Sequence, residues 1–244
     1  MSANLTTEDD SFPGASRGFG DPRPPLLASR RHAVRFLLIV CGIAILGLLQ
    51  SHRSAPPLPG SSRIPLYVSI AALQLLFVWF VRKGIRARGG SLRDLFGKRW
   101  HSFFDGLRDT VLALLFVGAL RGCALLLQYL LGQSSANTAF LLPSGPLELL
   151  LWIGVSIAAG VCEEIVYRGY LQPQLWALCG NLPLAIALQS LIFGIAHVYQ
   201  GWRPALITAI YGLAFGLVAA WRKSIIPGTI AHSLIDVIAG IFRR

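Results

Sequence analysis

Apolar runs of bilayer-spanning length alternate with short polar links along most of this chain. A transmembrane helix needs about 20 predominantly apolar residues. The runs occupy residues 36–49, 64–81, 110–131, 147–178, 182–199, 204–221 and 225–242. The pattern therefore predicts an all-α fold, a polytopic transmembrane helix bundle of about seven spans formed by residues 30–244.

The composition agrees with a membrane protein. Hydrophobic residues make up 54% of the 244 residues and charged residues only 14%, whereas soluble domains average about 25% charged residues. The net charge of +11 would suggest a nucleic-acid partner in a soluble protein. Here the basic residues flank apolar runs, which favours an anionic lipid surface, so we expect no nucleic acid as a partner. The cysteines are not paired in a CxxC motif, and we expect neither a disulfide framework nor a metal site.

The polar segments predict how the chain is oriented. Residues 1–29 are polar and rich in Pro, Gly and Ser, which predicts a disordered N-terminal tail. Residues 82–109 carry the densest basic charge, so this loop and the N-terminus are expected on the cytoplasmic side of the cell (plasma) membrane, with the 55–62 link outside. Apolar residues recur near helical spacing within that loop, which predicts a cytoplasmic amphipathic helix in the membrane interface, or a short soluble helix packed on the bundle. They are Leu92, Leu95, Phe96, Trp100, Phe103, Phe104 and Leu107.

A group of charged residues interrupts the fourth apolar run. Glu163, Glu164 and Arg168 lie in a stretch that is otherwise uncharged from residue 149 to residue 202. An ionisable side chain at bilayer depth costs roughly 3 kcal/mol or more, so it usually has a partner and marks function. Glu164 and Arg168 are four residues apart and can pair on one helix face. Glu163 lies about 100° around the helix and has no partner in its own segment, which leaves it available for chemistry.

Three more polar residues occur in the later runs: His197, His232 and Asp236. A single buried histidine is usually a hydrogen-bonded core residue, but desolvation favours the gathering of all these ionisable groups at one place. A carboxylate there could act as a general base on water, and imidazole N–H groups could stabilise an oxyanion. A zinc site with Glu and His ligands is the alternative chemistry, although the chain has no HExxH motif.

These residues carry a resemblance to a known family. The stretch EEIVYR at 163–168 resembles the EExxxR motif of the CPBP family, the Abi-like group of CAAX proteases and bacteriocin-processing enzymes. Residues 193–197 match the family's FxxxH motif, and residues 232–236 match its HxxxN/D motif. All three motifs occur in the family's order, and the similarity covers about residues 147–239.

The resemblance implies an intramembrane glutamic endopeptidase that works without a metal or another cofactor. It implies a membrane-associated peptide or protein substrate, prenylated or not. Glu163 would activate water with help from His197, and His232 and Asp236 would hold the oxyanion side. Glu164 and Arg168 would support the geometry. These groups are then expected within about one water molecule of each other.

Asp236 departs from the asparagine of the prenyl-protein endopeptidases. An ionised aspartate cannot donate a hydrogen bond to an oxyanion, so Asp236 either acts on the oxyanion side in another way or orients His232. Functions without turnover also stay open: a membrane scaffold, a bacteriocin-immunity protein, or a transporter whose buried charges relay protons.

Overall fold

The computed structural model describes residues 19–53, 61–132 and 141–242, without the side chains of residues 51–53. These residues form helices and no strand, and the all-α prediction is confirmed. The helices are α1 (Arg30–Arg53), α2 (Ile64–Arg86), η1 (Leu92–Phe96), α3 (Phe103–Leu131), α4 (Pro146–Glu164), η3 (Ile165–Leu171), α5 (Gln172–Cys179), α6 (Leu182–Ile195), η4 (Val198–Gln200), α7 (Trp202–Arg222) and α8 (Ile226–Phe242).

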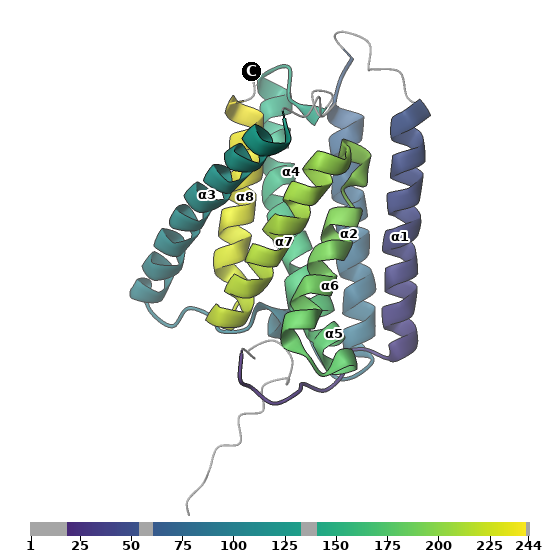
Figure 1. Cartoon of the computed structure of the whole chain (residues 1–244), viewed down its shortest axis with the longest axis vertical. Coiled ribbons are helices and arrows are strands. Elements are labelled where there is room, and N and C mark those ends of the chain that lie inside the picture. The colour runs from purple at the N-terminus through teal and green to yellow at the C-terminus, as the bar shows by residue number, and fades with distance from the viewer. Residues whose placement is uncertain (1–18, 54–60, 133–140, 243–244) are drawn as a thin grey trace, which may run out of the picture.

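Within the described ranges, five helical segments are long and apolar enough to cross a membrane, and two shorter apolar helices, α6 and α8, lie among them. The five are residues 30–50, α2, α3, the continuous 146–179 segment and α7. The expectation of about seven spans in a multi-pass membrane protein is therefore confirmed. In Figure 1 α1 stands at one edge of the bundle and α3 leans away at the opposite edge, with the other helices between them.

The long helix from residue 146 to residue 179 widens in its middle. Residues Ile165–Leu171 form a π-helix, and all seven are buried. Pro173 follows two residues after the end of this π-helix. An α-helical turn would press the proline ring against the carbonyl of Gly169, and the wider turns that precede Pro173 relieve this contact. The π-helix begins directly after the Glu163–Glu164 pair, so it determines the direction in which Arg168 points relative to the two glutamates.

The expected amphipathic helix in the 82–109 loop does not form as one element. Leu92–Phe96 is a short 3-10 helix, and the chain then turns at Gly97, which has a φ of 70°. Residue 97 pairs with Ser224, and the Lys98 N–H donates to the Lys223 carbonyl, so the loop attaches to the turn between α7 and α8. Leu95 is fully buried against the bundle instead of facing lipid. The structure is closer to the alternative, a short helix packed on the bundle, because the left-handed break at Gly97 interrupts the helical spacing.

The predicted disordered tail also differs from the structure in part. Residues 1–18 lie outside the described part of the chain. Residues 21–28, here called the strap, pack across the end of the bundle where the purple trace runs in Figure 1. Leu27 and Ala28 are fully buried. The helical domain therefore takes up chain that the polar composition had assigned to the tail.

Three polar anchors hold the strap. Lys223 Nζ lies 2.7 and 2.9 Å from the two carboxylate oxygens of Asp21. Arg23 donates to the last backbone carbonyls of α5, where a positive charge also complements the helix dipole. The fully buried side chain of Gln174 accepts from the backbone N–H groups of Leu27 and its successor at 2.9 and 3.0 Å. Polar groups that would otherwise be unpaired in the interior thus satisfy one another.

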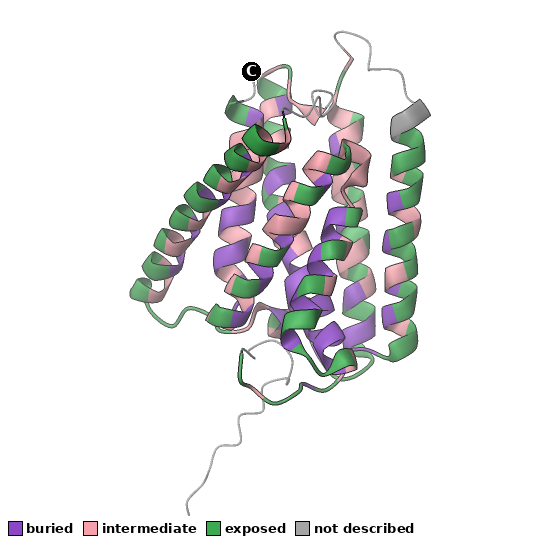
Figure 2. Cartoon of the chain, in the orientation of Figure 1, coloured by how far each residue is buried: buried purple, intermediate pink, exposed green. Residues whose placement is uncertain are grey.

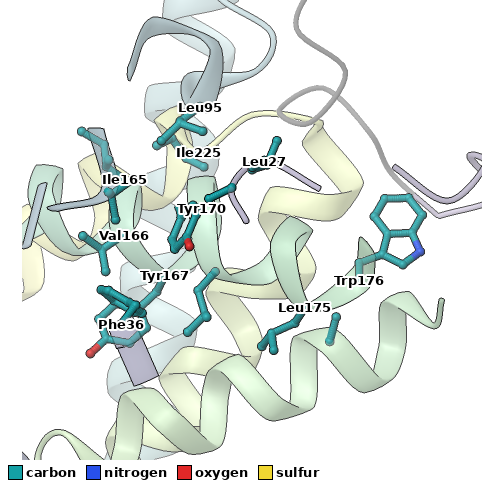
Figure 3. Close-up of a cluster of buried hydrophobic side chains, with 14 of the residues drawn as sticks. Leu27, Phe36, Leu95, Ile165, Val166, Tyr167, Tyr170, Leu175, Trp176 and Ile225 are labelled. Carbon is teal, nitrogen blue, oxygen red and sulfur yellow. The ribbon is translucent and has the colours of Figure 1, made fainter. Parts of the chain in front are cut away.

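The larger of two hydrophobic clusters in the described residues lies in the half of the bundle that adjoins the strap. Figure 2 shows buried residues concentrated in the central helices, whereas α1 and α3 expose most of their surface. Figure 3 shows the cluster to which the strap, α1, η1, η3, α5 and the residue before α8 contribute side chains. Among them are Leu27, Phe36, Leu95, Tyr170, Trp176 and Ile225. This packing buries Ile165 and Val166 and so holds the adjoining Glu163 and Glu164 in place.

Candidate active site

Glu164 connects two of the three motifs. Its Oε1 atom accepts a hydrogen bond from Arg168 Nη1 at 2.7 Å and another from His232 Nδ1 at 3.1 Å. The side chains of Glu164 and Arg168 are 0% exposed. The i,i+4 ion pair that the spacing predicted is therefore present, and both side chains are shielded from solvent. A buried carboxylate with two such donors is held in one rotamer, so Glu164 fixes the position of His232.

Aromatic rings surround the Arg168 guanidinium. Its central carbon lies 4.4 Å from the ring centroid of Phe193 on α6 and 5.1 Å from that of Phe215 on α7. Its Nη2 atom also reaches the carbonyl oxygen of Gly212 at 3.4 Å. The ring faces carry partial negative charge, so they help to stabilise a cation that has left water. Arg168 thereby ties the motif helix to both neighbouring helices.

His232 presents one ring nitrogen to the rest of the site. Because a carboxylate only accepts, Nδ1 donates to Glu164 and Nε2 is the nitrogen that faces outward. Nε2 lies 3.8 Å from Glu163 Oε2 and 3.7 Å from Asp236 Oδ2. The ring stacks on Phe215 with centroids 5.3 Å apart. Two partly exposed carboxylates, 23% and 36% for the side chains of Glu163 and Asp236, therefore flank one oriented imidazole.

Close contact between α4 and α8 sets these distances. Trp152 Nε1 donates to the backbone carbonyl of Asp236 at 2.9 Å. A Cβ on Gly160 would meet Ser233 Oγ and would lie 2.7 Å from the Ser233 backbone nitrogen. A Cβ on Gly240 would collide with the Trp152 indole. The two glycines thus let the helices approach until Glu163 and His232 face each other.

His197 lies next to this group but not inside it. Its Nδ1 atom is 2.8 Å from the Phe193 carbonyl oxygen, so Nδ1 donates and Nε2 is left with a lone pair. The rings of His197 and His232 contact Phe193 at centroid distances of 4.8 and 6.0 Å. Phe193 therefore lies between the two imidazoles, and His197 approaches the site from the end of α6.

The structure brings five of the predicted residues into contact: Glu163, Glu164, Arg168, His232 and Asp236. The imidazole of His232 lies close to the carboxylates, as expected. His197 contacts Phe193, and Phe193 in turn contacts His232. Sequence reasoning gave no role to Phe215, which contacts Arg168 and His232, because an aromatic residue in an apolar run is usually interpreted as lipid-facing. Among the described residues, no group of three or more His, Cys, Asp or Glu side chains has an arrangement that could hold a metal ion.

Comparisons with known proteins agree with the motifs. The sporulation-killing factor biosynthesis protein SkfC of Bacillus subtilis (strain 168) is 28% identical over 64 residues. That alignment covers 26% of this chain and 13% of SkfC, so the chain spans a small part of the relative's length. No solved structure matches the chain. Residues 145–238, which contain all three motifs, match the model of the Rce1-like type II CAAX prenyl endopeptidases.

Proposed function

We propose that this chain is an intramembrane endopeptidase of the plasma membrane in which Glu163 activates the attacking water. The single observation that carries the proposal is the position of Glu163. Its carboxylate is partly exposed and lies 3.8 Å from an imidazole nitrogen, while its neighbour Glu164 is buried and already bound to two donors. One carboxylate supports the site and the other is available to react. The match of residues 145–238 to the model of a family of endopeptidases supports the same reaction class.

The geometry supports a simple sequence of steps. Glu163 takes a proton from water, and the resulting hydroxide attacks the carbonyl carbon of the scissile amide. The negative charge that develops on the carbonyl oxygen is met by an N–H donor at Nε2 of His232, whose positive charge the surrounding carboxylates stabilise. The protonated Glu163 then gives its proton to the leaving nitrogen, and the C–N bond breaks to give a carboxylate and an amine. His197, through its free Nε2, is placed to hold the water or the substrate.

The place of the site supports a substrate class. Glu163 lies in the 146–179 segment, which is long and apolar enough to cross a membrane, and His232 lies in the shorter apolar helix α8, so we propose a membrane-associated peptide or protein, prenylated or carrying its own apolar segment. SkfC is named for the biosynthesis of a sporulation-killing factor, which makes the precursor of a peptide factor a second candidate substrate. Nucleic acid is not among the proposed partners.

The test compares cells that express the wild type with cells that express Glu163→Gln. This substitution keeps the size of the side chain and removes the basic oxygen. Peptidomics of the two membranes should show cleaved products only with the wild type. With the purified proteins and a quenched farnesylated peptide, turnover should fall at least ~100-fold, the low end for the loss of a general base.

Either of two results would contradict the proposal and favour another function. A Glu163→Gln variant that retains the wild-type phenotype would favour a scaffold, immunity or transport function without turnover. Activity that is lost with chelators and restored by zinc would favour a metal enzyme with Glu163, His197 and His232 as ligands.

A further inference from the structure

One charged side chain of the membrane region has no part in the site described above. Arg121 lies in α3, which is otherwise uncharged from residue 110 to its end at Leu131. At 1.5 Å per residue, Arg121 is about 15 Å from either end of this uncharged stretch, so in a membrane-spanning α3 it lies near the middle of a hydrocarbon core about 30 Å thick. An arginine at this depth usually has a partner and marks function.

The described part of this chain does not supply that partner. Arg121 is exposed, and among the described residues neither an ion pair nor a hydrogen bond joins it to the rest of the chain. Two other buried carboxylates are engaged elsewhere: Asp109 binds Arg222 at 2.9 Å, and Glu148 accepts from two backbone N–H groups at 2.7 and 2.9 Å. Outside the described ranges the sequence has acidic residues only at positions 8–10. The exposed cation therefore points to a partner molecule that carries a negative charge.

The surface of α3 around Arg121 is open to a close neighbour. Leu114 and Leu125, two turns before and one turn after Arg121, are exposed on the same side of the helix. A Cβ built on Gly118 or on Gly122 would meet no atom within 4 Å. These five residues, here called the α3 face, place one cation among apolar and small residues. A second helix could approach the α3 backbone closely there.

The α3 face lies near the depth of the candidate active site. The carbonyl of the residue before Arg121 accepts a hydrogen bond from the Tyr211 hydroxyl on α7 at 3.0 Å. One turn earlier, the Phe116 ring lies 5.2 Å from the Phe215 ring, and Phe215 stacks on His232. Helix α3 therefore adjoins the wall of the site, and a segment bound to the α3 face would lie close to the level of the reacting groups.

Charge complementarity favours one kind of occupant. Lipid phosphates lie at the membrane surfaces, about 15 Å from Arg121 along α3. A second copy of the chain that used this face in a two-fold contact would bring two arginines together. A membrane-spanning segment with an aspartate or glutamate at mid-depth meets the cation directly, and the ion pair satisfies both charges in apolar surroundings.

We propose that the α3 face docks the substrate, as an apolar helical segment with one acidic side chain that pairs with Arg121. The docked segment holds the substrate beside α8, and its adjoining residues reach Glu163 and His232 for cleavage. Arg121 takes no part in the reaction and selects the substrate. The face lies outside residues 145–238, the segment that matches the endopeptidase model. The inference rests on the proposed endopeptidase function and narrows its substrates to membrane-spanning segments with an internal acidic residue.

Photocrosslinking in nanodiscs measures docking apart from catalysis. The purified full chain carries Glu163→Gln, so that the probe stays intact, and a photoreactive phenylalanine stands at position 125. The probe is a leucine–alanine helix with lysines at both ends and one central glutamate, and the matched probe has glutamine in its place. We expect half-maximal crosslinking at about 10-fold less glutamate probe than glutamine probe, the lower end for a charge-assisted hydrogen bond.

Variants of Arg121 test whether the preference depends on the ion pair. Arg121→Gln should remove the preference, and Arg121→Glu should instead prefer a probe with a central lysine. The photoreactive residue at position 75 is the control for unspecific contact. Leu75 is exposed on α2, and crosslinking from there should not distinguish the glutamate probe from the glutamine probe.

A second experiment asks whether docking governs cleavage. Peptidomics compares cells that express the wild type, Glu163→Gln, Arg121→Gln or Arg99→Gln. Products that depend on Glu163 and come from proteins with Asp or Glu inside an apolar segment should fall at least ~10-fold in Arg121→Gln. Arg99→Gln removes an exposed arginine that precedes α3 and should leave these products unchanged. Because Arg121→Gln makes α3 more apolar, we expect this variant to insert and fold.

Each outcome has a distinct meaning. Equal crosslinking of the two probes, or a preference that survives Arg121→Gln, overturns the docking, and the proposed function stands if the Glu163-dependent products persist. Crosslinking of position 125 to lipid or to a second copy in place of the glutamate probe also overturns it. A glutamate preference without any effect of Arg121→Gln on the products does so too, because the face then binds a partner that is not the substrate. If the wild type and Glu163→Gln give the same products, the proposed function fails, and substrate docking fails with it.

Discussion

Replacing Arg168 by leucine should destabilise the protein severely. The substitution removes the 2.7 Å partner of Glu164 and leaves a carboxylate with 0% side-chain exposure beside an apolar group. Breaking a buried ion pair from one side typically costs about 3–5 kcal/mol. The contacts of the guanidinium with Phe193 and Phe215 are lost as well, which places the expected cost at the upper end of that range.

Thermal unfolding in detergent can measure this cost. For a chain of this size, 1 kcal/mol shifts the midpoint by roughly 2–4 °C, so a cost of about 5 kcal/mol should lower the Arg168→Leu midpoint by about 10–20 °C. A thiol-reactive fluorophore gives the readout, because Cys162 is 8% exposed and becomes reactive on unfolding. The exposed Cys41 and Cys179 are first replaced by serine. Arg121→Leu is the matched control, since Arg121 is an exposed arginine within α3 and its loss should leave the midpoint nearly unchanged.

A third variant isolates the charge. Arg168→Lys keeps a cation near Glu164 but loses the planar guanidinium group. Its unfolding midpoint should therefore fall between the midpoints of Arg168→Leu and Arg121→Leu. The reasoning would be refuted if Arg168→Leu purified in normal yield with the wild-type midpoint. Glu164 would then be stable without its cation, and the support of His232 would have to come from elsewhere.

Three further predictions address topology, packing and metal dependence. In a background without the native cysteines, Ser61→Cys and Arg93→Cys should label from opposite sides of the membrane; labelling from the same side would reject the proposed orientation. Gly160→Ala should destabilise by about 1–3 kcal/mol, and adding Ser233→Ala should not restore stability, because the Ser233 backbone nitrogen still lies 2.7 Å from the new Cβ; a full rescue would show that the hydroxyl alone limits the approach. Peptidase activity should persist in EDTA and phenanthroline, with no stoichiometric zinc by elemental analysis; inhibition that zinc reverses would contradict this.

The local features of the site could be predicted because they depend on helix geometry alone. Glu164 with Arg168 and His232 with Asp236 are both four residues apart, and both pairs appear in the structure at 2.7 and 3.7 Å. The gathering of the two pairs follows from the cost of leaving charges unpaired in an apolar interior. What joins them, the hydrogen bond from His232 to Glu164, depends on how α8 packs against α4 and has no signature in the sequence.

The number of helices could likewise be predicted from apolar runs, whereas their connections could not. Gly97 ends η1 in the left-handed region, and Leu95 packs inward, although both lie in a stretch with helical spacing. The strap was missed because its apolar residues are few and its anchors are distant in sequence. Phe215 and Tyr199 look like ordinary aromatic residues of a membrane helix until the fold places them beside Arg168 and His197.

The strap has a consequence for the order in which the protein can be completed. Its anchors, Gln174 and Lys223, are made long after Asp21 and Leu27 have left the ribosome. At roughly 5–20 residues per second, the interval from residue 21 to residue 223 is on the order of 10–40 s. During that time the first helices can insert into the bilayer, and Gln174 and the α5 carbonyls become available to the strap before Lys223 does. The docking of the strap is therefore completed only after the turn between α7 and α8 has been synthesised, and a chain truncated before Lys223 lacks the partner of Asp21.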